Sequence, residues 1–390
     1  MEYRTLGKTN EKVSILGFGG MRLPTLDSND QINEKLAREI LSYGIGNGIN
    51  IIDTAYSYHY GDVSGQAGNS EPFLGEFLEN GYREKVLLST KLPSWNVEKK
   101  EDLEFYLNEQ LKRLKTDYFD IYLLHALNEE NWEVYKECGV FDFIDTALGD
   151  GRIKHIGFST HADFEKLVEI IDDYDKWEVA LTQLNYLDST YQTGVDGLNF
   201  LSEHKIGNMI MEPLRGGRLV ENIPQDIQDM WNTSEIKRSP VEWAFQYLWD
   251  MENVHCVLSG MNSMEQVKEN IELASKSKER PLTDEDKFLI SDVGREYKFR
   301  KGNDCTECGY CMPCKEGINI PHCFREYNIA KMLDNASTTA MHYFTYYDDK
   351  SLAHNCKECA DCKSMCPQMI NIPEELKKVS KYFGREFNHF

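Results

Sequence analysis

The feature that most constrains the fold is a regular alternation of short apolar runs with longer amphipathic stretches through residues 1–280. The runs are largely β-branched or Leu-rich and lack strict alternation, which is typical of strands buried on both faces. There are eight, at Ser14–Gly20, Asn50–Ala55, Val86–Leu92, Phe119–His125, Ile153–Thr160, Val179–Tyr186, Asn208–Leu214 and Val254–Gly260. Eight βα units in roughly 270 residues match a (β/α)8 barrel in number and size.

A doubly wound α/β sheet is the alternative, but no Gly-x-Gly-x-x-Gly follows the first run, where Gly17-Phe18-Gly19-Gly20 has a different spacing. Residues 1–13 predict a short hairpin on the barrel floor. We therefore expect a barrel domain over residues 1–280, a helical linker over 281–300 and a cysteine-rich domain over 301–390.

Charge narrows the function classes. The 390-residue chain has a formal net charge of −22, and residues 1–295 carry all of this excess. Nucleic-acid binding needs a basic face, and an anionic membrane surface also attracts basic segments, so we expect neither partner. No apolar run approaches the roughly 18–20 residues of a membrane span, and the start of the chain has no apolar signal core. These observations predict a cytoplasmic protein without membrane insertion.

Of the 11 cysteines, nine lie after residue 300, and eight of these form a duplication. The first copy reads Cys-x2-Cys-x2-Cys-x2-Cys over 305–314, and the second reads Cys-x2-Cys-x2-Cys-x3-Cys over 356–366. Each copy is followed by Ile-Asn-Ile-Pro and a helical pattern, so the module is expected to be mostly α-helical. Dense cysteines at the end of a long chain indicate metal binding in a reducing compartment.

The two copies resemble bacterial-type two-cluster ferredoxins, in which the fourth cysteine of each run binds the other cluster. The resemblance implies one [4Fe–4S] cluster on Cys305, Cys308, Cys311 and Cys366 and another on Cys356, Cys359, Cys362 and Cys314. Two zinc sites are the alternative, although zinc would leave the third cysteine of each run redundant. Cys138, Cys256 and Cys323 are expected to be packed thiols.

Polar residues end three of the predicted strands: Asp53, Lys91 and His125, with Tyr58 in the loop after Asp53. Because the strand ends of a barrel surround one mouth, an acid, a phenol, an amine and an imidazole should meet there. We expect Lys91 to lower the Tyr58 pKa from about 10 and Asp53 to keep Lys91 charged. Such a tyrosine can donate a proton to a carbonyl oxygen.

This set resembles the aldo-keto reductases over residues 3–275, through Asp-Thr-Ala-x-x-Tyr at 53–58, Lys91, and Leu-Leu-His at 123–125. The resemblance implies hydride transfer between NADP or NAD and a small carbonyl or alcohol. It assigns catalysis to Tyr58, Lys91, Asp53 and His125. It gives Ser159 and Gln183 to the carboxamide, and Glu269 with Asn270 to the adenine. The full set of implied cofactor residues is Gly20, Met21, Ser159, Gln183, Met211, Pro213, Leu214, Gly217, Gln266, Glu269 and Asn270.

The sequence departs from the family at several points. Met211 stands where an aromatic residue usually stacks on the nicotinamide, and Thr160 replaces an asparagine. Lys268 is the only cation near Ser259–Gln266, which leaves NADP, NAD and a flavin open. The loop after Met211 has paired glycines that could approach a pyrophosphate, with Arg215 or Arg218 as counter-ion, or could form a simple tight turn.

Three functions follow. The barrel could be a nicotinamide-dependent carbonyl reductase whose clusters serve electron transfer or docking. It could instead hold a flavin or another redox group, which receives electrons from a redox partner through the clusters. The reason is that nicotinamide passes electrons in pairs and a cluster passes them singly, whereas a flavin can do both. It could also be a non-catalytic electron-carrier subunit. The complete catalytic set argues against the third, and we predict the first.

Overall fold

The computed structural model describes residues 1–26, 31–59, 67–345 and 348–384. The chain divides into two compact units. The first comprises Met1–Gly216 and Ser239–Thr283, and the second comprises Gly217–Arg238 and Asp284–Phe390. Residues 217–238, between the last two barrel strands, thus belong to the second unit, which a simple division near residue 280 does not anticipate.

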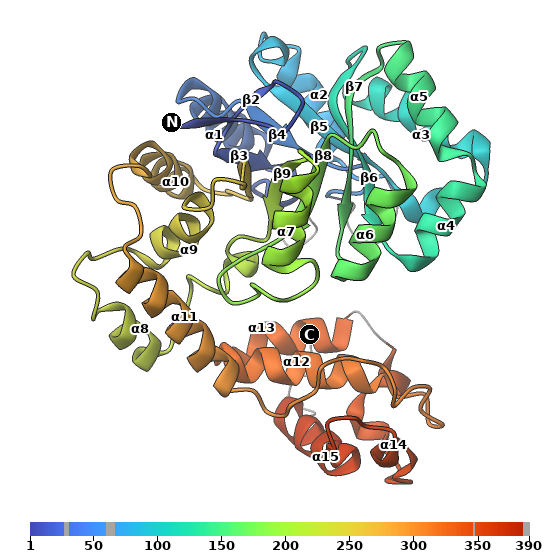
Figure 1. The fold of residues 1–390 in the computed structure, drawn as a ribbon, viewed down its shortest axis with the longest axis vertical. Coiled ribbons are helices and arrows are strands. Elements are labelled where there is room, and N and C mark those ends of the chain that lie inside the picture. The colour runs from blue at the N-terminus through green and yellow to red at the C-terminus, as the bar shows by residue number, and fades with distance from the viewer. Residues whose placement is uncertain (27–30, 60–66, 346–347, 385–390) are drawn as a thin grey trace. The chain divides into compact units, whose positions relative to one another are not determined.

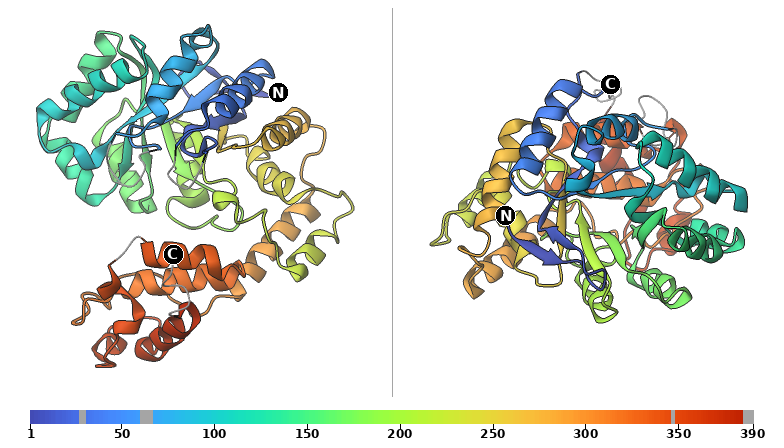
Figure 2. Two further views of the ribbon diagram at one scale, coloured as in Figure 1. Left: turned by 180° about the vertical axis from the view of Figure 1, so that it is seen from behind. Right: turned by 90° about the horizontal axis from the view of Figure 1, so that it is seen from above.

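The first unit is a closed barrel, which confirms the (β/α)8 prediction and rules out the doubly wound sheet. The ring of strands is visible in Figure 1 and from the further directions of Figure 2. Neighbouring strands pair in parallel, as in the register of Lys91 with Leu123. In barrel order the strands are β10 (Cys256–Ser259), β3 (Leu16–Gly19), β4 (Ile51–Asp53), β5 (Leu87–Leu92), β6 (Phe119–Leu127), β7 (Ile153–Thr160), β8 (Val179–Gln183) and β9 (Gly207–Met211).

Helices cover the outside of the barrel, and side-chain caps fix where several begin. Asn33, Asp163, Ser239 and Ser263 each accept a hydrogen bond from a backbone N–H in the first turn of the helix that follows. The helices of this unit are α1 (Glu34–Gly46), α2 (Ser70–Leu78), α3 (Lys100–Arg113), α4 (Glu129–Glu137), α5 (Val140–Gly149), α6 (Phe164–Asp173), α7 (Gly194–Glu203), α9 (Pro240–Trp249) and α10 (Met264–Lys276).

The barrel interior is filled by a separate cluster of buried apolar side chains that includes Ile51, Leu123, Leu181, Met209 and Leu258. Packing there is tight enough to require glycine. A Cβ added at position 17 would lie 2.7 Å from Leu258 Cδ2 and 2.9 Å from Ile51 Cγ2.

The predicted hairpin is present as β1 (Tyr3–Thr5) paired antiparallel with β2 (Lys12–Ser14). Leu6 and Val13 join the interior cluster and are fully buried. Lys8 N donates to the Lys205 carbonyl just before β9 begins, so the hairpin closes the amino-terminal end of the barrel and leaves the opposite end for a site.

The second unit is mostly helical in the residues described. Its helices are α8 (Gln225–Trp231), α11 (Asp284–Phe299), α12 (Ile320–Met332), α13 (Ala336–Thr345), α14 (Asp361–Ser364) and α15 (Ile372–Phe383). Asp286 of α11 accepts hydrogen bonds of 2.9 Å from both Arg238 Nη1 and Ser234 Oγ. This buried contact ties residues 217–238 to α11. Among the residues described, no helix is both long and apolar enough to cross a membrane.

Candidate functional site

Strand periodicity brings the predicted residues to one end of the barrel. Successive side chains on a strand point to opposite faces, so a residue two places after an interior one also points inward. Asp53 follows Ile51 by two places, His125 follows Leu123, and Gln183 follows Leu181. The inward positions at the carboxyl ends of β4 to β9 are therefore Asp53, Lys91, His125, Ser159, Gln183 and Met211.

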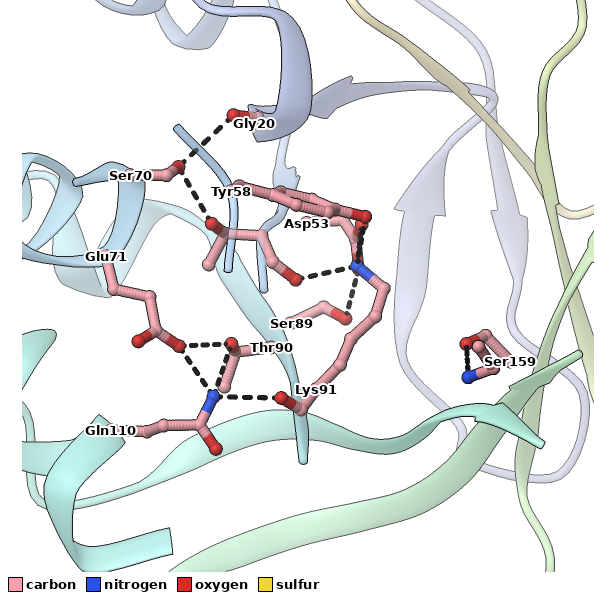
Figure 3. Close-up of polar contacts among 12 residues, drawn as sticks. Gly20, Asp53, Tyr58, Ser70, Glu71, Ser89, Thr90, Lys91, Gln110 and Ser159 are labelled. Carbon is pink, nitrogen blue, oxygen red and sulfur yellow. Dashed lines mark hydrogen bonds and ion pairs between the residues drawn. The ribbon is translucent and has the colours of Figure 1, made fainter. Parts of the chain in front are cut away.

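Lys91 is the centre of the polar contacts at this mouth (Figure 3). Its Nζ donates to Asp53 Oδ2 at 2.5 Å, to the Thr54 carbonyl at 2.6 Å and to Tyr58 Oη at 3.2 Å. Ser89 Oγ donates to the other Asp53 oxygen at 2.8 Å. Because an ammonium has three protons, Lys91 is fully engaged and holds the Tyr58 hydroxyl in a fixed place.

The prediction that Lys91 brings the Tyr58 pKa below its ordinary value is wrong. Burial raises the pKa of Tyr58 and outweighs the opposing effect of Lys91, while Asp53 raises that pKa further. Burial disfavours the Lys91 ammonium, but Asp53 and Tyr58 reverse this and the pKa of Lys91 is raised overall. The site therefore holds a charged lysine beside a protonated tyrosine.

His125 lies next to the tyrosine. Its ring centroid is 6.2 Å from that of Tyr58, in an edge-on arrangement, and 4.8 Å from that of the half-exposed Trp95. Burial lowers the pKa of His125 well below its usual value, and the charge of Lys91 adds to the effect. Its Nδ1 is buried and finds no hydrogen-bond partner in the part of the chain that the structure describes. A neutral imidazole therefore remains able to bind a ligand.

A buried network beneath Lys91 was not predicted. Glu71, in α2, is fully buried and accepts from Thr90 Oγ1 at 2.7 Å, Gln110 Nε2 at 2.6 Å and Arg113 Nε at 2.7 Å. Gln110 Nε2 also donates to the Lys91 carbonyl at 3.0 Å. The network thus fixes the backbone that carries Lys91. A sequence pattern does not reveal it, because burial of a charged helix residue depends on three-dimensional packing.

The carboxamide candidates lie on adjacent strands. Ser159 Oγ accepts from Ala126 N at 2.8 Å, which leaves its hydroxyl hydrogen to be donated. Gln183 Nε2 donates to Asp188 Oδ2 at 3.1 Å, whereas the buried Gln183 Oε1 has no partner among the described residues. Thr160 is engaged within the fold, since its hydroxyl donates to the Leu127 carbonyl at 2.7 Å. Ser159 and Gln183 thus offer one donor and one acceptor.

The loop after β3 contains a cationic residue, Arg22, that was not among the predicted site residues. Gly20 is buried and its carbonyl accepts from Ser70 Oγ at 3.2 Å, while the Met21 side chain is 58% exposed. Arg22 follows, and its stem covers Gly260: a Cβ added there would lie 2.9 Å from Arg22 Cβ. A Cβ on Gly216 would lie 3.2 Å from Arg22 Nη2. Arg22 therefore lies between the loops after β9 and β10.

The loop after β9, predicted either to approach a pyrophosphate or to form a simple tight turn, has several contacts within the fold. Pro213 is buried and Leu214 packs against the main core. Arg215, predicted as a possible counter-ion for a ligand, pairs instead with Asp188, with 3.1 Å between Nε and Oδ2. Gly217 and Arg218 belong to the second unit.

Gln266 and the two residues assigned to the adenine, Glu269 and Asn270, have contacts within the first unit. Asn262 N donates to Gln266 Oε1 at 2.9 Å, and the buried Asn270 donates to Ser259 Oγ at 3.2 Å. Glu269 is exposed and accepts from Ser239 Oγ at 3.4 Å. Asn270 thus fixes the end of β10, and Gln266 and Glu269 lie on the first turns of α10.

The two cysteine copies share their backbone conformation where each begins. Glu307 N donates to Cys305 Sγ at 3.4 Å, and Glu358 N donates to Cys356 Sγ at 3.4 Å. Glu307 and Glu358 have positive φ angles of 62° and 56°. Positive φ is uncommon outside glycine, so its recurrence at matching positions indicates one structural unit used twice.

Most cysteines of the two copies lie around one small core. Six of the eight repeat cysteines pack against one small apolar core, and Cys308 and Cys359 are exposed. Burial raises the pKa of Cys305, and the neighbouring thiols of Cys308 and Cys366 raise it further.

Cys362 repeats this arrangement in the other copy. Burial raises its pKa, with Cys314 and Cys356 as neighbours that raise it further. In each case a neighbour comes from the opposite copy. Within the described ranges, no three His, Cys, Asp or Glu side chains are close enough to bind one metal ion.

Comparison with known proteins identifies the class. Residues 15–290 match the aldo/keto reductase family, and the chain belongs to it. It is 27% identical to protein tas of Escherichia coli K12 over 224 residues, covering 50% of this chain and 63% of tas, which is less than two thirds of that relative. It is 25% identical to the uncharacterized oxidoreductase YqkF of Bacillus subtilis over 315 residues, covering 73% of this chain and 94% of YqkF.

Among solved structures, the aldo-keto reductase AKR11C1 from Bacillus halodurans in its holo form matches with a TM-score of 0.60 and 26% identity. The match covers 75% of this chain and 96% of AKR11C1. The family match ends at residue 290, before the first cysteine copy begins. The comparisons therefore establish the family and barrel fold of the first unit.

Proposed function

We propose that the protein is a nicotinamide-dependent carbonyl reductase that also carries two [4Fe–4S] clusters. The observation that carries the reductase proposal is Lys91, whose Nζ joins Asp53 and Tyr58 through direct hydrogen bonds. Burying an ion pair costs desolvation free energy, so the pair is weak evidence for stability. We infer that its role is to position the Tyr58 phenol at the mouth of the barrel.

A reduced nicotinamide, when bound, supplies a hydride to a carbonyl carbon. The chain's own residues supply the proton. Tyr58, kept protonated by burial, donates it from Oη to the carbonyl oxygen, and Lys91 stabilises the phenolate left behind. The neutral His125 can donate a hydrogen bond to the same carbonyl oxygen. The Trp95 ring packs beside the His125 ring and lines the substrate side of the mouth.

The residues at the mouth fit a nicotinamide. A carboxamide has one acceptor and one donor end, which match the hydroxyl hydrogen of Ser159 and Gln183 Oε1, an atom without a partner among the described residues. Met211 offers a polarisable thioether to the ring. Arg22 lies beside Gly216 and Gly260, where it can neutralise an anionic part of the cofactor.

The environment of α10 favours NADH over NADPH. Lys268 is the only cation in residues 259–270, and its Nζ lies 5.7 Å from the centroid of the Tyr43 ring. Glu265 and Glu269 flank it on the same helix and would repel a 2′-phosphate.

Titration of the purified protein with NADH and NADPH, followed by tryptophan fluorescence, tests the cofactor. We expect saturable binding of both, tighter for NADH, and oxidation of NADH when small aldehydes or ketones are added. If neither cofactor binds, the reductase proposal fails. A bound flavin, visible as a band at about 450 nm, would favour the alternative in which clusters supply a flavin in the barrel.

The cluster proposal rests on the mixing of the two cysteine copies. Cys366 neighbours Cys305, and Cys314 neighbours Cys362, as expected when each run lends its fourth cysteine to the other cluster. Each thiolate of a [4Fe–4S] cluster binds a different iron, so the sulfurs stand farther apart than four ligands of one zinc ion. Clusters held by these cysteines would supply one-electron transfer or hold the unit together. Metal analysis of the purified protein distinguishes iron from zinc.

A further inference from the structure

Asp188 organises the carboxamide side of the mouth. Its Oδ2 accepts from Gln183 Nε2 at 3.1 Å and from Asn185 Nδ2 at 3.0 Å, and it pairs with Arg215 Nε at 3.1 Å. Asp188 itself is held by an Asx turn, because Asn185 Oδ1 accepts from the backbone N–H groups of Leu187 and Asp188 at 3.0 Å each. Asp188 as a residue is 8% exposed, and these contacts fix its side chain in place.

This contact decides which end of the Gln183 amide faces Asp188. An amide can be turned over with little change in shape, and its orientation follows from its partners. A carboxylate only accepts hydrogen bonds, so the group next to Asp188 must be the NH2 of Gln183. The oxygen Oε1 then points away from Asp188, and it is this buried atom that finds no partner among the described residues.

Arg215 lowers the electrostatic cost of burying the Asp188 carboxylate. Its guanidinium offsets the charge of Asp188, and its backbone is held at a positive φ of 50°, an uncommon conformation for a residue other than glycine. The Arg215 side chain is therefore placed at some conformational cost to stand beside Asp188.

We propose that Asp188 is a positioning residue that fixes Gln183 as a hydrogen-bond acceptor, and thereby selects a ligand that presents an NH2 group. The proposal rests on the nicotinamide function above and deepens it. It states that the site discriminates a carboxamide from a carboxylate, since a carboxylate would set a second acceptor against Gln183 Oε1. Leaving both acceptors buried and unpaired is costly.

The test compares binding of NAD⁺ with binding of nicotinic acid adenine dinucleotide, in which a carboxylate replaces the carboxamide. For the wild-type chain we expect the carboxylate analogue to bind at least about tenfold more weakly. In Asp188→Ala the Gln183 amide is free to turn its NH2 toward the ligand, and the ratio should fall below about threefold. Asp196→Asn, an exposed carboxylate lost from α7, is the matched control and should keep the wild-type ratio.

The affinity ratio separates positioning from general damage, because a distorted barrel weakens both ligands together. Gln183→Met, which removes the acceptor but leaves Asp188 in place, should also abolish discrimination and keeps the proposal testable if Asp188→Ala does not fold. An unchanged ratio in either folded variant overturns the proposal. If the wild-type chain binds NAD⁺ without discriminating, the proposal alone fails; if it binds neither dinucleotide, the reductase function fails as well.

Discussion

The two polar centres of the molecule are built in opposite ways. At the barrel mouth, Lys91 uses all of its donors on Asp53, Thr54 and Tyr58, so the fold itself completes the catalytic group. In the second unit, six of the eight repeat thiols pack against a small apolar core. Burial raises the pKa of Cys311, and the neighbouring thiols raise it further. The first centre is stable as the chain alone makes it. We propose that the second is completed by the clusters that its sulfurs bind.

The sharpest way to break this comparison is to remove the Tyr58 hydroxyl. Loss of a positioned general acid costs typically 10²–10⁴-fold, so Tyr58→Phe should lower kcat for carbonyl reduction by about that factor. Absorption of the clusters should not change, because the substitution lies in the barrel. Tyr56→Phe, two residues away, is the control and should retain turnover. Equal turnover in Tyr58→Phe would show that the phenol is not the proton donor.

Removing the lysine should damage both rate and stability. Lys91→Met leaves Asp53 buried beside an apolar chain, and breaking one side of a buried ion pair costs about 3–5 kcal/mol. Denaturant unfolding of the barrel measures that loss. The double variant Asp53→Asn with Lys91→Met removes both charges and should regain most of the stability while staying inactive. An active double variant would mean that the pair serves the fold rather than the chemistry.

Substitution of one cluster cysteine in the second unit should remove one cluster and leave the other. Cys314 follows its run by x2 where the second copy has x3, which makes it the ligand that most needs testing. We expect Cys314→Ser to lower the iron content from about eight to about four per chain. Cys323→Ser removes a fully buried thiol that contacts the Tyr343 hydroxyl at 3.7 Å and should leave the iron unchanged. The reverse pattern would exchange the roles of these two cysteines.

The smallest expected effect is on the pH profile. Burial raises the pKa of Tyr58 above the ordinary value of about 10, and a general acid works only while protonated. Because burial also lowers the pKa of His125, no break is expected near that residue's usual value of about 6.5. The reduction rate should therefore stay flat from neutral pH to beyond about pH 10. A fall in kcat/KM below that point would contradict a tyrosine kept protonated by its raised pKa.

Periodicity explains how much could be predicted. Asp53, His125 and Gln183 follow interior residues by two places, so a correct strand assignment brings them to one mouth. The duplication of the cysteine copies is visible in the spacing of the cysteines alone. By contrast, Glu71 and Arg22 meet residues far away in the sequence, and Asp188 pairs with Arg215 of a later loop. The contact of Asp286 with Ser234 joins residues 217–238 to α11, and no sequence pattern indicates it. The Tyr58 pKa was misjudged because charge is visible in a sequence but burial is not.

The proposed function joins a nicotinamide-dependent barrel to a pair of iron–sulfur clusters, and one measurement tests it most directly. Protein purified without oxygen is analysed for iron, sulfide, zinc and visible absorption, and then titrated with NADH. We predict about eight iron and eight sulfide per chain, a broad band at about 400 nm, and saturable NADH binding. Zinc in place of iron, or full clusters with no NADH binding, would contradict the account.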